Sequence, residues 1–453
     1  MPNISSLQTP LSALRAHQRI LEATANNVAN ASTPGYRRQR VETVTTSGEA
    51  VNIGGVITAT KTGVDSTQLT RTADELLIAR ATTEEANLSS AQTASTTLSR
   101  IEAIFPEPSD FGLAGQLDAL WSSWSELSTD PASQSLRSDV LAKASAVTAT
   151  LRRSAADLGA IASGTHQQLR VLADRVNGLT AELADYNRRV ASQPTVPPSM
   201  LDERDRLVNQ LTTLTGAVVR VTGDNTVAVT IGGHQVVQGL HHERVEAPSG
   251  ALRLERSGQV MLPTSGEAAA MVSTINDIVP RYLSALDDVA ASLVSTVNAL
   301  HTAGYGQDGV SGRMFFDPAG VTATTIALSA DVAGQPARLA AGAPVLPGPV
   351  APGPLDGNQA RLLAALADSA TGPDSRYQQM ISNLAVETRA AKQRSDVQRT
   401  VVENAIRDVN AVSSVSIDEE MSQMIESQRA YQAAGKVLST IDEMLGYLIE
   451  RVG

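Results

Sequence analysis

The sequence of 453 residues contains no cysteine, which excludes disulfide bonds, thiolate catalysis and cysteine-ligated metals. Aromatic residues make up only 3% of it, although hydrophobic residues make up 42%. Much of the apolar content is alanine, which favours long, closely packed helices over a bulky aromatic core. No apolar run approaches the ~18 residues of a membrane span, and we expect no cleavable signal peptide.

Positive charge is also scarce. The formal net charge is −11 and the sequence pI is about 5.1, so neither nucleic acid nor an anionic membrane is an expected partner. The length allows two or three domains of about 100–200 residues.

Patterns typical of catalytic and metal sites are missing as well. The only adjacent histidines, His241-His242, would point to opposite faces of a strand. Glu419-Glu420 lies on a predicted helix, where neighbouring residues do not face each other. The glycine-rich loop 304–312 lacks both the Gly-Lys-Ser/Thr ending of a P-loop and the closing glutamate of a calcium loop. We predict no catalytic residues, no metal and no cofactor.

The N-terminal segment has the spacing of a helix. Its apolar residues recur in steps of three and four, with a polar interruption at Gln18, and the helix stops at the turn-forming run 26–36. The predicted assembly residues of this helix are Leu7, Leu11, Leu14, Leu21 and Val28.

The C-terminal segment also has near-heptad spacing. Its predicted assembly residues are Ile417, Met421, Met424, Tyr431, Leu438, Ile441, Leu445 and Leu448. Val437 and Met444 place further apolar side chains on other faces, which indicates more than one neighbour. The pattern leaves two interpretations open: each terminal helix belongs to an ordinary bundle, or the two pair with each other and with neighbouring subunits.

Between the ends, helical spacing returns from about Thr67 to Phe105 and continues in several long stretches, whereas residues 37–64 look extended. Period-two alternation over residues 217–265 predicts one small antiparallel β unit, with a turn at Gly232-Gly233. The predicted fold is mainly α with this β domain inserted. The predicted domains are nested along the sequence: a terminal helical, coiled-coil-like domain (1–60 and 400–453) encloses a long-helix domain (61–216 and 266–399), which encloses the β domain (217–265).

Several segments resemble flagellar axial proteins, the family of rod, hook and junction subunits. The run from Leu21 to Tyr36 is similar to the signature of that family, and residues 415–421 and 428–434 resemble its closing helix. The signature residues are Asn26, Asn27, Pro34, Gly35 and Tyr36. Internal stretches at 201–208, 232–239 and 282–316 resemble most closely the hook-associated junction proteins.

The resemblance implies a structural subunit between hook and filament, secreted through the flagellar type III pathway into the extracellular axial structure. The terminal helices would line a tube and assemble copies of the chain into a ring. The hook subunit would lie on one side and a second junction protein on the other, and an export chaperone would bind the C-terminal helix. Residues 317–360 leave room only for a short connection, so we expect one outer β domain rather than two.

Two other functions remain as alternatives. A hook or rod subunit would share the terminal signatures, but the internal stretches at 201–208 and 282–316 speak against it. A hydrolase that cleaves the cell wall would need a pair of carboxylates in a cleft, and the sequence offers no candidate pair.

Overall fold

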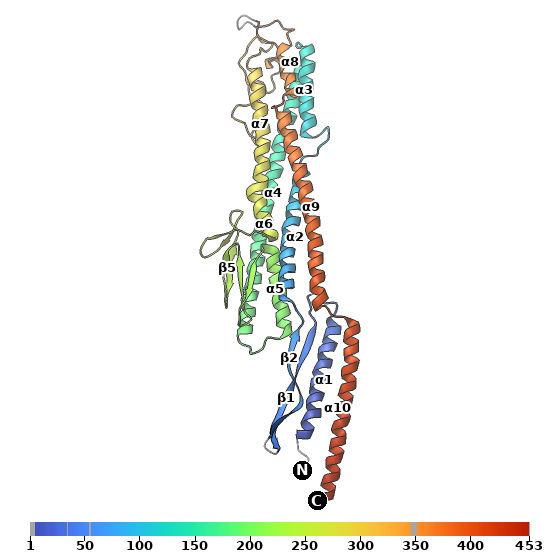
Figure 1. The fold of residues 1–453 in the computed structure, drawn as a ribbon. Helices are drawn as coiled ribbons and strands as arrows, with labels where there is room; N and C mark the ends of the chain where they lie inside the picture. Colours follow the sequence, from blue (N-terminus) through green and yellow to red (C-terminus); the bar gives the residue numbers. More distant parts are fainter. Residues whose placement is uncertain (1–4, 34, 54–55, 346–350, 453) are drawn as a thin grey trace. The chain divides into compact units, whose positions relative to one another are not determined.

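The computed structural model describes residues 5–33, 35–53, 56–345 and 351–452. The fold is mainly helical with small antiparallel sheets inserted, which confirms the predicted fold class (Figure 1). It divides into two compact units: unit 1 comprises residues 1–86, 176–244 and 399–453, and unit 2 comprises residues 87–175 and 245–398. The three nested domains stay a prediction. No helix in the described ranges is long and apolar enough to cross a membrane.

Unit 1 contains both terminal helices, α1 (Ser5–Asn30) and α10 (Ile417–Val452), which pack against each other. It also contains α5 (Pro198–Thr215), and it shares α2 (Glu75–Glu102), α4 (Gln134–Ala191) and α9 (Pro373–Ser413) with unit 2. The first turn of α10 carries three consecutive acidic residues, which complement the positive end of the helix dipole.

A long hairpin follows α1. Its strands β1 (Gln39–Ile53) and β2 (Val56–Arg71) pair antiparallel from Gln39 opposite Arg71 to the tip, and both strands contact α1. The prediction of helix from Thr67 was therefore wrong. Pairing with β1 holds the chain extended through Arg71, and α2 starts only at Glu75, where the Asp74 carboxylate accepts hydrogen bonds from the backbone amides of Leu76 and Leu77.

A four-stranded antiparallel sheet of unit 1 has the order β3 (Val218–Val221), β4 (Val227–Ile231), β5 (His234–Gln238) and β6 (His241–His242). Alternate residues of β4 are buried, as period-two alternation requires. Both turn glycines, Gly232 and Gly233, have positive φ angles, in agreement with the predicted turn. The buried amide of Asn187 on α4 bonds to the backbone N–H and C=O of Val227 and so fixes the sheet to this helix.

A second, three-stranded sheet belongs to unit 2 and comprises β7 (Val245–Glu246), β8 (Leu252–Leu254) and β9 (Val260–Met261). The prediction of a single β unit over residues 217–265 therefore needs correction, because these residues form two sheets. Strands β6 and β7 have only two residues each, so neither is long enough to continue a ladder from one sheet into the other.

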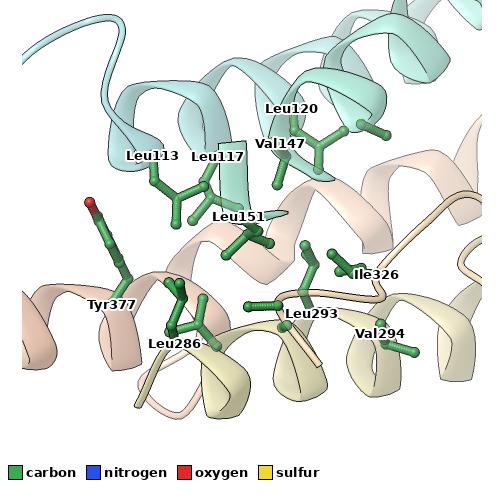
Figure 2. Packing of buried hydrophobic residues seen from close by; sticks show 14 of the residues in the cluster. Leu113, Leu117, Leu120, Val147, Leu151, Leu286, Leu293, Val294, Ile326 and Tyr377 are labelled. Carbon is green, nitrogen blue, oxygen red and sulfur yellow. The ribbon is translucent and has the colours of Figure 1, made fainter. Parts of the chain in front are cut away.

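The large apolar core lies in unit 2. Leucines of α3 (Leu113–Thr129), including Leu117 and Leu120, meet Val147 and Leu151 of α4 and Leu286 and Leu293 of α7 (Val279–His301) (Figure 2). The short α8 (Asn358–Ala364) packs against α3 and α7. The 3-10 turns Pro336–Arg338 and Ala365–Asp368 complete the helical elements of the described ranges in this unit.

One helical stretch of unit 2 contains a wide turn. Between α6 (Gly266–Ser273) and α7 lies a π-helical segment, Thr274–Ile278, and Pro280 follows it after one intervening residue, Val279. A proline ring clashes with the carbonyl four residues earlier and cannot donate an amide proton. The π turn widens the helix just before the proline, and the helix then continues to His301.

Candidate assembly site

Helix α1 contacts the hairpin as well as α10, and it lies between them (Figure 1). Of its predicted assembly residues, Leu7, Leu14, Leu21 and Val28 are half-buried, while Leu11 is 40% exposed. The fully buried positions of α1 are small or polar, among them Ala16, Ala23, Thr24 and Asn27. The close approach of α10 and the hairpin to α1 therefore depends more on small side chains than on the leucines of α1.

The predicted assembly residues of helix α10 differ in their exposure. Four are half-buried: Met424, Leu438, Ile441 and Leu445. Three others are 41–53% exposed: Ile417, Met421 and Tyr431. The side chain of Leu448 lies outside the described residues, as does Pro34 of the signature. One side of α10 thus meets α1, and a second side carries the exposed apolar residues Met421 and Ile425.

The signature residue Asn27 is the centre of a buried polar contact between the two ends of the chain. Its side-chain amine donates to the backbone oxygen of Gln39 and to the Glu420 carboxylate, both at 2.9 Å. Its oxygen accepts from the Gln39 amide at 2.9 Å and from the Tyr36 hydroxyl at 2.8 Å. All four hydrogen-bonding positions of the Asn27 amide are therefore used at a site that is only 1% exposed.

The signature continues with Arg38, which pairs with the start of α10. Its guanidinium lies 2.7 Å from the Glu420 carboxylate and 2.8 Å from that of Glu419. Its backbone amide donates to the carbonyl of Ser413, the last residue of α9. Because Glu420 is only 1% exposed, its charge requires these partners. We call Asn27, Tyr36, Arg38, Gln39 and Glu420 the polar clasp.

Beside the clasp lies a second charged cluster. The guanidinium of Arg71 on β2 donates to Asp205 at 2.7 Å and to Asp202 at 3.0 Å, both on α5. Arg204 donates to Asp205 and to Glu75 of α2. Burial lowers the pKa of Arg71, but Asp205 and the other acidic partners raise it above its usual value. The cluster fixes the hairpin to α5 and α2 within unit 1.

Electrostatics favour the neutral form of the Tyr36 hydroxyl. Burial, together with the carboxylates of Asp202 and Glu420, raises the pKa of Tyr36 to about 12. The Tyr36 hydroxyl is therefore a neutral donor over the physiological range. Burial also raises the pKa of Asp202, against the opposing effect of Arg71.

The structure brings together only part of the predicted signature. Asn27 and Tyr36 enter the clasp, whereas Asn26 is exposed and its side-chain oxygen accepts a hydrogen bond from Asn30. Gly35 has a φ angle of 83°, a left-handed conformation that favours glycine at this turn. Arg38, Gln39 and Glu420 were not among the predicted site residues. The adjacent like charges in Arg37-Arg38 and Glu419-Glu420 were the feature of the sequence that could have indicated these residues.

Unit 2 contains a buried histidine, His301, whose ring bonds to backbone groups on both sides. His301 is 0% exposed; its Nδ1 donates to the Arg313 carbonyl at 2.8 Å, and its Nε2 accepts from the Ala340 amide at 3.0 Å. Burial lowers the pKa of His301 to about 4, so the ring is neutral. No group of three or more His, Asp or Glu residues suited to a metal ion occurs in the described part of the chain.

Comparisons with known proteins match three separate parts of the sequence. Residues 98–316 match the family model described as the flagellar hook-associated protein FlgK helical domain. Residues 7–37 match the flagella basal body rod protein model, and residues 410–451 match the C-terminal model of the flagellar basal body rod FlgEFG proteins. The two terminal matches contain the residues of the polar clasp at 27, 36 and 420.

Individual relatives also point to flagellar hook-associated proteins. Flagellar hook-associated protein 1 of Bacillus subtilis is 27% identical over 513 aligned residues, which cover 99% of this chain and 98% of the relative. The protein of the same name from Salmonella typhimurium is 23% identical over 69% of this chain and 59% of its own length. The solved structure of the flagellar hook junction protein FlgK from Burkholderia pseudomallei is similar in fold, with a TM-score of 0.65 and 14% identity. The structural match covers 74% of this chain and 100% of the chain of the solved structure.

A long helical middle between two terminal helices of the rod-protein type defines a structural subunit of the bacterial flagellar axis. Within that class, the helical-domain match and the relatives make the chain similar to flagellar hook-associated protein 1. Its role is structural, at the junction between hook and filament, and its location is the secreted axial structure of the flagellum. The family is not a family of enzymes.

Proposed function

We propose that the chain is exported by the flagellar type III pathway and then assembles at the hook tip through α1 and α10. Copies of the chain form a ring, with the hook subunit on one side and a second junction protein on the other. Before export, a dedicated chaperone binds α10. The predicted inner domain, residues 1–60 and 400–453, contains both of these helices.

The observation that carries this proposal is the second apolar side of α10. Four apolar residues of α10 are half-buried on the side of α1, yet Met421 and Ile425, on another side of α10, remain 44% and 47% exposed. Burying apolar surface contributes about 25 cal/mol per Å², so such a side is stabilised by a further neighbour. A subunit that contacts several others through its terminal helices supplies such neighbours.

Electron microscopy of cells that lack this chain tests the function. We expect hooks without filaments and filament subunits released into the medium, and both defects should disappear when the wild-type chain is restored. Removing residues 417–453 should prevent incorporation at the hook tip. Normal filaments on the hooks of cells without the chain would contradict a junction role.

We also propose that the chain has no catalytic activity and no cofactor. The wall-cleaving hydrolase considered above predicts release of soluble fragments from purified cell wall. Wild-type chain should release no more than the Asn26→Asp variant or buffer. Release by the wild-type chain would favour the enzyme alternative.

A further inference from the structure

The break between α9 and α10 has no glycine or proline to account for it. Other helices of the chain end at such residues: Pro131 follows α3, Pro194 follows α4, and Gly216 caps α5. Both residue types interrupt a helix through the backbone itself. No glycine or proline occurs between Pro373 and Gly435, yet α9 ends at residue 413 and α10 begins at residue 417 (Figure 1).

The local sequence is compatible with a break and with a continuous helix. The linking residues, Ser414-Val415-Ser416, are weaker helix formers than alanine, but none of them is a helix breaker. The amide of Ser414 still donates to the carbonyl of Asn410 at 3.0 Å, which is a helical bond. Ser416 and Glu419 have the spacing of a capping box, which favours a helix start. The Glu419 carboxylate, however, pairs with the segment that precedes β1.

Two consecutive arginines of that segment contact both sides of the break. The backbone amide of Arg38 donates to the Ser413 carbonyl at 3.0 Å, the acceptor that the Ile417 amide would use in a continuous helix. The guanidinium of Arg37 donates to the Ser413 hydroxyl at 3.0 Å. The guanidinium of Arg38 lies 2.7 and 2.8 Å from two carboxylates in the first turn of α10. One dipeptide thus occupies the end of α9 and the start of α10.

The dipeptide is itself attached to other elements of unit 1. The amide of Thr72, which follows β2, donates to the Arg38 carbonyl at 2.8 Å. The Arg37 guanidinium lies 3.7 Å from the carboxylate of Asp205 on α5. Ser413 is only 3% exposed, so its contacts form at a buried site. The break therefore has its partners in a segment that lies 376 positions earlier in the sequence.

We propose that Arg37 and Arg38 impose the break, and that α9 and α10 continue as one helix when residues 36–39 are not docked. The inference concerns the fold of unit 1 and goes beyond the proposed function. Docking of the N-terminal signature then sets the direction of α10 relative to the end of α9. A segment with two backbone states, biased by a few contacts from elsewhere in the chain, is a conformational switch.

Pairs of histidines test whether the linking residues are helical. Two histidines four residues apart on one side of a helix bind a divalent metal together. Ser414→His with Asp418→His spans the break, and Ser422→His with Glu426→His lies within α10; all four positions are exposed. Each pair would be placed in the full chain with and without Arg37→Ala and Arg38→Ala. Calorimetric titration with Cu²⁺ then gives the affinity of each pair above that of the matching single histidine.

In the double-alanine chain we expect the pair across the break to bind Cu²⁺ at least tenfold more tightly than in the otherwise wild-type chain. The pair within α10 should bind equally in both. Arg40→Ala, an exposed position in the same hairpin, is the control and should leave the pair across the break at its wild-type affinity.

Three results would overturn the proposal. If the pair across the break stays weak in the double-alanine chain while the pair within α10 stays tight, the break has another origin. If both pairs become weak, α10 unfolds instead of joining α9. If the pair across the break is already tight with both arginines present, the linking residues are helical in the docked chain. None of these results bears on the junction role, which is tested in cells that lack the chain.

Discussion

At the scale of single residues, the structure explains why two neighbouring asparagines of the signature are not equivalent. Asn27 is buried and uses its amide fully, whereas Asn26 is exposed on the same helix. Replacing Asn27 by aspartate keeps the shape but removes the two N–H donors. The new carboxylate would face the Glu420 carboxylate and the Gln39 carbonyl, which now accept from the Asn27 amine.

Asn27→Asp should therefore destabilise unit 1 by roughly 2–4 kcal/mol, the usual cost of unpairing a buried charge network. The matched control Asn26→Asp should change stability by less than about 0.5 kcal/mol, as exposed substitutions do. Denaturant unfolding followed by far-ultraviolet circular dichroism measures both. Equal effects of the two variants would contradict the clasp.

His301 predicts a specific sensitivity to acid. Its pKa is about 4 in the folded chain and about 6.5 when unfolded, so the unfolded state binds more protons between these values. The stabilisation is complete above pH ~6.5 and decreases as the pH falls toward 4, by a few kcal/mol at most. Protonation of Nε2 also removes the acceptor for the Ala340 amide.

The measurement is the stability of unit 2 at pH 7, 5.5 and 4.5, followed by tryptophan fluorescence, since the Trp124 ring lies 6.4 Å from His301. His301→Gln should be less stable at pH 7, but its stability should depend much less on pH between pH 6.5 and 4 than that of the wild type. His241→Gln, on an exposed strand, is the control and should retain the wild-type slope. If the stability of His301→Gln decreases with falling pH as steeply as that of the wild type, this histidine is not the origin of the acid sensitivity.

At the scale of elements, α10 has two apolar sides with different functions. Leu445 lies on the half-buried side, and Ile425 is 47% exposed on the other. An aspartate is costly where the side chain is desolvated and nearly free where it is hydrated. In the isolated chain, Leu445→Asp should therefore lower the temperature at which the α1–α10 pair melts. Ile425→Asp should leave this melting temperature within about 2 °C of wild type.

Both variants should reduce incorporation at the hook tip, but for different reasons: Leu445→Asp weakens the helix pair, and Ile425→Asp weakens the contact between copies. Thermal melts together with motility measurements separate the two. Normal swimming of Ile425→Asp would contradict an assembly function of the exposed side.

Periodicity explains which elements the sequence could predict. The heptad spacing of α1 and α10 and the alternation in β4 each come from burial on one side of a single element, and this leaves a local pattern. The hairpin was missed as a hairpin because its strands are rich in threonine and carry few alternating apolar residues. The clasp was missed because Asn27 and Glu420 are 393 positions apart, and a single polar contact has no period.

At the scale of the whole molecule, the two units differ in how they are stabilised. The continuous apolar cluster belongs to unit 2, where leucines and aromatic rings are fully buried. In unit 1, α1 and α10 meet through half-buried apolar residues, small side chains and the polar clasp. Sequence composition indicated closely packed helices but could not assign the large apolar cluster to one unit, because that assignment depends on tertiary contacts.

This difference should separate the unfolding of the two units, and the chain contains a natural probe for it. Both tryptophans, Trp121 and Trp124, are buried on α3 in unit 2. On heating, far-ultraviolet circular dichroism should lose part of the helical signal, from α1 and α10, before tryptophan fluorescence changes, because less apolar area is buried there. Asn27→Asp should shift the early loss of helix to lower temperature and leave the fluorescence midpoint unchanged. If the two probes give superimposable curves that shift together in Asn27→Asp, the whole chain unfolds as one cooperative unit and the separation inferred from its packing is wrong.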